Sequence, residues 1–133
     1  MATGKEDQEL EFELQELYLT GKQWLSDIAF LEEELVFLTE LMDKSPFSLH
    51  GTGQGKQEEI MVALSLQNAA HKELKWEVNI YMNKLEPLII EPNIKIGMLL
   101  IEDYIRLKEK VANSLLDLKS LKYACVNVYR NDG

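Results

Sequence analysis

Two histidines and one cysteine are the side chains of this 133-residue chain best suited to general-base, nucleophilic or metal chemistry. Di-iron helical bundles carry a Glu-x-x-His motif on facing helices, whereas Phe47 and Asn68 stand three residues before His50 and His71. The two histidines also lack the helical spacing of a zinc-binding pair. Cys125 and His71 could form a nucleophile–base pair only if the fold brought them together, and we favour a buried structural cysteine. The sequence therefore predicts no cofactor, no metal site and no enzyme activity.

A polar layer interrupts one predicted apolar seam at Gln67 and His71. The layer could line a small-molecule pocket beside Trp24 or Trp76. It could equally fix the register of the helices, which is the best-attested role of a polar residue in a seam. We favour the register interpretation, because buried polar groups normally find protein or water partners.

The stretch that must position these side chains runs from residue 10 to residue 42, where apolar residues recur in alternating steps of four and three. This spacing predicts a long amphipathic helix. Gly21 leaves the one hole in its seam. We expect the helix to span about 6–44, because Pro46 disfavours helical backbone at the residue before it. The seam residues are Leu10, Leu14, Leu17, Trp24, Ile28, Leu31, Leu35, Leu38 and Met42.

The same spacing predicts two further helices, over about 57–86 and about 94–129. A glycine-rich loop over 45–56 joins the first two helices. Pro87 is expected to end the second helix and to open a proline-bounded turn over 87–93, whose apolar residues would cover one end of the bundle.

Extra apolar positions are expected to give the second helix a second packed face and to widen the apolar face of the third helix. On the second helix and then the third, they are Val62, Leu66, Ala69, Trp76, Ile80, Ile101, Ile105, Ala112 and Leu115.

Three helices joined by direction-reversing connections predict an all-α fold, an antiparallel up-down-up three-helix bundle of long coiled-coil-like helices. The chain fits one domain over 1–133. The sequence alone leaves open whether two such bundles associate into a larger one.

The charge is concentrated at one end of the chain. Residues 1–43 hold twelve acids against Lys5 and Lys22, and the whole chain has a formal net charge of −9. An acidic surface argues against nucleic acid or an anionic membrane as the main partner. A single cysteine, no apolar leader segment and no membrane-length apolar run favour a cytoplasmic location.

A second apolar row follows the first helix on the side away from its seam. At about 100° per residue, Phe12, Leu19, Phe30 and Phe37 fall in one narrow row. The acids that line its two sides are Glu9, Glu16, Asp27 and Glu34 on one side and Glu11, Glu33 and Glu40 on the other. The bundle could bury this row by packing on both sides of the helix. We favour an interface, because exposed apolar stripes of this size mark association surfaces.

The sequence thus predicts a non-catalytic helical protein–protein interaction or oligomerisation module. Its expected partner is a protein, either a second copy in a homo-oligomer or a separate amphipathic helix. The surface that meets the row should have basic edges, because two acidic faces repel each other. The alternative is a small-molecule-binding bundle using the polar layer. The third helix offers basic residues for a self-association face, namely Arg106, Lys108, Lys110, Lys119 and Lys122.

Overall fold

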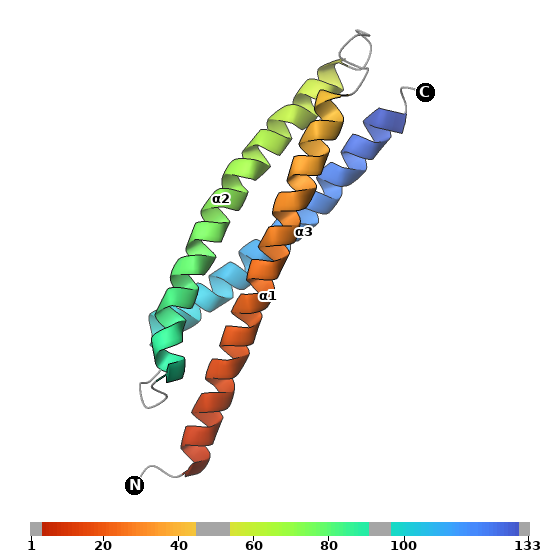
Figure 1. Cartoon of the computed structure of the whole chain (residues 1–133). Helices are drawn as coiled ribbons and strands as arrows, with labels where there is room; N and C mark the ends of the chain where they lie inside the picture. The colour runs from red at the N-terminus through yellow and green to blue at the C-terminus, as the bar shows by residue number, and fades with distance from the viewer. Residues whose placement is uncertain (1–3, 45–53, 91–96, 131–133) are drawn as a thin grey trace.

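The computed structural model describes residues 4–44, 54–90 and 97–130 (Figure 1). It contains α1 (Gly4–Asp43), α2 (Gln54–Ile90) and α3 (Met98–Arg130), and no strand occurs in these ranges. The three helices all contact one another. The predicted all-α three-helix bundle is therefore confirmed. Most of the expected glycine-rich loop, over 45–53, and most of the expected turn, over 91–96, lie outside the described residues.

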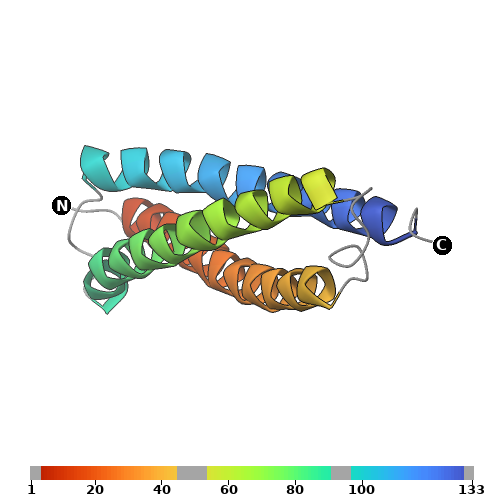
Figure 2. The ribbon, with the colours of Figure 1, turned by 90° about the horizontal axis from the view of Figure 1, so that it is seen from above.

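The chain runs up, down and up, so that α1 and α3 point the same way and α2 opposes both (Figures 1 and 2). The ring of Trp24 on α1 is central to the packing, because it lies 5.5 Å, centroid to centroid, from both Tyr81 of α2 and Tyr104 of α3. Aromatic pairs at this separation add to the stabilisation that burial alone provides. Farther along, Glu34 of α1 reaches Lys122 of α3.

Most residues of the predicted seams are buried in the core. The α1 seam is fully covered from Gly21 to Met42, while Leu10 and Leu17 are half-buried. The buried side chains form two clusters, one around Trp24 and Tyr81 and one around the C-terminal half of α1. Burial of apolar side chains at this spacing is what holds such long helices together.

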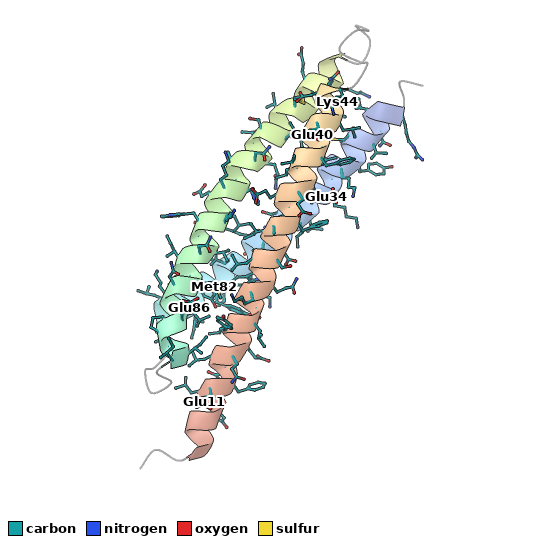
Figure 3. All side chains as sticks on the ribbon, in the orientation of Figure 1. Glu11, Glu34, Glu40, Lys44, Met82 and Glu86 are labelled. Atoms are coloured by element: carbon teal, nitrogen blue, oxygen red, sulfur yellow. The ribbon has the colours of Figure 1, made fainter. Side chains whose placement is uncertain are left out.

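Gly21 is a notch rather than an empty site. A Cβ atom added at Gly21 would collide with the Sδ atom of Met82, and it would lie 3.5 Å from the ring of Tyr81. Met82, which Figure 3 labels on α2, is itself only 4% exposed. The missing side chain in α1 therefore lets α2 approach closely, and the flexible thioether fills the space.

Specific hydrogen bonds pair backbone groups at the C-terminal end of α1 and at the N-terminal end of α3. The side-chain amide nitrogen of Gln57 donates a buried 2.8 Å hydrogen bond to the carbonyl of Met42, one of the last carbonyls of α1 that lack a partner within the helix. The carbonyl of Gly97 accepts bonds from the backbone amides of Leu100 and Ile101, which starts α3. α3 thus begins about four residues later than expected.

Two expectations about α2 are wrong. The helix begins at Gln54 and does not stop at Pro87, which lies inside it. Proline removes only one helical hydrogen bond here, and the carbonyl that loses its donor belongs to the solvent-exposed Asn83. The next two residues, Leu88 and Ile89, pack against the core cluster. Their burial favours the extra helical turn.

The expected second packed face of α2 and the expected wider buried face of α3 are also mostly wrong. Val62, Leu66 and Trp76 are 60–67% exposed, and Ile101 and Ile105 are 44% and 60% exposed. Ala69 and Ala112 are exposed too, whereas Ile80 and Leu115 are half-buried. Each helix of a three-helix bundle has only two neighbours, both on its inner side, so that outward rows remain uncovered.

Candidate interaction surface

The outer row of α1, defined as Phe12, Leu19, Phe30 and Phe37, lies on the surface of the molecule. Phe12 is 62% exposed and Leu19 is 65% exposed, while Phe30 and Phe37 are 48% and 54% exposed. Large apolar side chains that lie in line on a helix surface form a continuous patch of the kind that binds other proteins.

Acidic side chains line this row. Glu9, Glu16, Glu11, Glu33 and Glu40 are exposed, and they have no ion-pair partner among the described side chains of residues 9–44, 55–90 and 97–128. Several of the row's neighbours thus keep an unneutralised negative charge. That charge favours a partner with basic edges.

The other two acids of the row face protein groups. Glu34, which Figure 3 labels on α1, lies 3.3 Å from the Nζ atom of Lys122 on α3. The half-buried Asp27 accepts a 3.0 Å hydrogen bond from the side-chain amide of Gln23. At about 100° per residue, Glu34 lies about 50° around the helix from Phe30 and Phe37. The ion pair therefore places these two phenylalanines on the side of α1 that borders α3.

Some basic residues of α3 are engaged within the bundle. Arg106 and Lys110 both contact Glu77 of α2, at 3.2 and 3.0 Å. Hydrogen bonds to Asp103 and the nearby charge of Glu77 raise the pKa of Arg106. Lys108 and Lys119 are exposed and have no ion pair in the part of the chain that the structure describes. These two lysines are therefore available to a partner.

A second outer row, on α3, was missed at the level of sequence. Met98, Ile105, Leu116 and Tyr123 are 76%, 60%, 62% and 71% exposed. Their separations along the chain are 7, 11 and 7 residues, the same as in the outer row of α1. That shared spacing is the signal that could have identified this row before the structure.

The polar layer faces α1 through His71. Its Nε2 atom lies 3.9 Å from the carboxylate of Glu32, which also contacts Lys75 at 3.5 Å. Both ring nitrogens of His71 are buried without a hydrogen-bond partner among the described residues. Burial lowers the pKa of His71, with Glu32 opposing that effect. The residue is thus held neutral near pH 7.

The four residues of the alternative ligand pocket are not brought together. Gln67 is half-buried and lines an open hollow between α2 and α3, whereas Trp76 is 65% exposed. Trp24 is buried against Tyr81, ten residues along α2 from His71, which is about 15 Å of helix. Within the described residues, the geometry therefore gives no support to one pocket shared by all four side chains.

The remaining candidate groups for chemistry are dispersed. Cys125 is buried in the cluster at the C-terminal half of α1, and burial raises the pKa of its thiol. His50 lies outside the described residues. Within those residues, no three His, Cys, Asp or Glu side chains are grouped to hold a metal ion.

A comparison of the chain with protein-family models, curated proteins and solved structures finds no match in any of the three sets. In the ranges that the structure covers, none of the helices has the length and apolar content required to cross a membrane.

Proposed function

We propose that the chain is a non-catalytic helical interaction module that binds another helix through the outer row of α1. The observation that carries the proposal is the exposure of three phenylalanines and a leucine in one line, between 48% and 65% each. Covering such side chains is favourable in proportion to the apolar area removed from water. Aromatic anchors of this kind commonly dominate the energetics of helical interfaces.

The electrostatics specify the kind of partner. The exposed acids beside the row favour an amphipathic helix with an apolar centre and basic edges, and they disfavour an acidic one. Exposed pairs of this type would contribute more to association rate and selectivity than to affinity. A homo-oligomer and a separate basic helix both fit this chemistry. A cytoplasmic location is part of the proposal and rests on the single, buried, free cysteine.

The test compares two doubly substituted chains. Phe30→Glu with Phe37→Glu places charges in the row, whereas Val62→Glu with Leu66→Glu adds the same charge to a somewhat more exposed apolar patch on α2. Binding of a fluorescein-labelled amphipathic Leu/Lys helical peptide is followed by anisotropy at protein concentrations low enough to limit self-association. We expect wild type and the α2 variant to bind alike, and the row variant to bind at least about 30-fold more weakly.

Two results would contradict the proposal. Equal binding by both variants would show that the peptide uses another surface. Loss of helicity in the row variant, measured by circular dichroism, would show that the phenylalanines are needed for the fold of the single chain.

A further inference from the structure

The outer rows of α1 and α3 are matched in sequence position. Each α3 residue, from Met98 to Tyr123, stands 86 positions after its counterpart in the row Phe12, Leu19, Phe30 and Phe37. All eight side chains are exposed by about half or more. The two rows therefore have the same length and the same internal spacing.

The bundle places the two rows at matching heights. α1 and α3 point the same way, and α3 crosses α1 obliquely (Figures 1 and 2). They meet through Trp24 with Tyr104 and through Glu34 with Lys122. The two residues of the first contact are fewer than 86 positions apart along the chain, and those of the second contact are more than 86 positions apart. The 86-position offset between the rows therefore lies between these two separations. Each α1 row residue thus lies roughly level with its α3 counterpart.

The α1 row borders the side of α1 that faces α3, and the α3 row points outward from the bundle. The α1 row lies about 50° around the helix from Glu34, which faces α3. On α3, Tyr123 lies about 100° around the helix from Lys122, which faces α1. It lies at about the same angle from the direction of Arg106, which faces α2. The strip from one row to the other therefore crosses the outside of the α1–α3 pair and stays clear of α2.

We infer that this strip binds a second copy of the chain, with a two-fold axis parallel to the helices. This inference rests on the proposed function and names its partner. A two-fold interface requires that, when one residue contacts a second, the second contacts the first in return. Equal spacing at equal height meets this condition. Phe30 would contact Leu116 of the partner subunit, and Phe37 would contact Tyr123 of the partner subunit, with both contacts repeated by symmetry.

Along one edge of the strip, the charges favour this arrangement over the other symmetric one. Placing α1 on the partner's α3 sets the acidic edge of Glu16 and Asp27 beside the side of α3 that carries the free Lys108 and Lys119. The spacing of the α1 row also reads the same in reverse, so that two antiparallel α1 helices could pair Phe12 with Phe37 of the partner subunit. That pairing would bring together two segments that each carry a net charge of −10, and like charges oppose it.

The size of the strip suits a stable dimer. From residue 12 to residue 37 a helix extends about 38 Å, and two helices side by side are about 20 Å wide. The resulting face of about 750 Å² is close to the roughly 800 Å² that each partner contributes to a standard protein interface.

Cross-linking of mixed chains that each carry one introduced cysteine tests the arrangement. Phe37→Cys and Tyr123→Cys chains are mixed and treated with a short bismaleimide. The native Cys125 is buried, and untreated and wild-type controls measure the background cross-linking that it gives. Because each chain carries one accessible thiol, any link joins two chains. We expect covalent dimers in this mixture, and few in a mixture of Phe12→Cys with Phe37→Cys.

Few covalent dimers in the Phe37→Cys and Tyr123→Cys mixture, together with many in the Phe12→Cys and Phe37→Cys mixture, would overturn the parallel arrangement in favour of antiparallel α1 pairing. A wild-type chain that stays monomeric at millimolar concentration would overturn the dimer altogether. In that case the peptide titration described above decides the proposed function separately, since it measures binding to the α1 row without a second copy.

Discussion

The notch at Gly21 gives a sharp prediction about packing, which is tested by the substitution Gly21→Ala. An alanine in the middle of an unhindered helix is about 1 kcal/mol more favourable than glycine. At Gly21 the new Cβ would collide with the Sδ atom of the buried Met82. Overpacking of a core costs about 1–3 kcal/mol, and the flexible thioether places the cost near the middle of that range. We expect a net loss of about 1 kcal/mol in the free energy of unfolding.

A double-mutant cycle separates the two effects. Met82→Ala alone removes a buried side chain and should cost about 2–5 kcal/mol. In that background Gly21→Ala meets an empty space, and we expect it to become neutral or stabilising, with a coupling energy of about 1–3 kcal/mol. The free energies are obtained from urea denaturation followed by circular dichroism.

A matched control comes from Gly55, where an added Cβ meets nothing within 4 Å. Gly55→Ala should leave the stability unchanged or raise it slightly. The reasoning about the notch is refuted if Gly21→Ala stabilises the protein by about 1 kcal/mol, or if the effect of Gly21→Ala is the same with and without Met82.

Two further predictions concern buried polar groups. Burial lowers the pKa of His71 below 6.5 against the attraction of Glu32 and with help from Lys75 and Lys72, so that below pH 6.5 the unfolded chain binds more protons and stability falls with acidification. Wild type should therefore lose more stability than His71→Leu between about pH 7.5 and pH 5.5 in urea titrations, and an equal loss in both would show that His71 is not responsible. Gln57→Met removes the hydrogen bond to the end of α1 and should lower the unfolding free energy by about 1 kcal/mol, whereas unchanged stability would show that water replaces the bond.

Sequence reasoning was most successful where the apolar spacing alone decides the outcome. Trp24, Ile28 and Leu35 are buried because they repeat on one side of a helix, and Phe12 and Leu19 are exposed because they lie opposite. Such patterns depend on helix geometry, which is the same in every bundle.

The features that sequence could not give depend on how the helices meet. Pro87 is a local signal to end a helix, but the burial of Leu88 and Ile89 outweighed it. The partner of Lys122 follows from the height of α3 against α1, and the use of Met82 to fill the notch follows from the register of α1 against α2. Neither register is fixed by heptad spacing, which every helix of this chain shares.

The central claim is that the outer row of α1 is a surface for association rather than part of the core of one chain. The most direct test is the light-scattering mass of the wild-type chain, measured from low micromolar to millimolar concentration beside the variant Phe30→Glu with Phe37→Glu. We predict that the wild-type mass rises toward twice the 15.3 kDa of one chain, while the variant stays at one chain with unchanged helicity. A variant that dimerises as wild type does, or one that loses its helical structure, would contradict the claim.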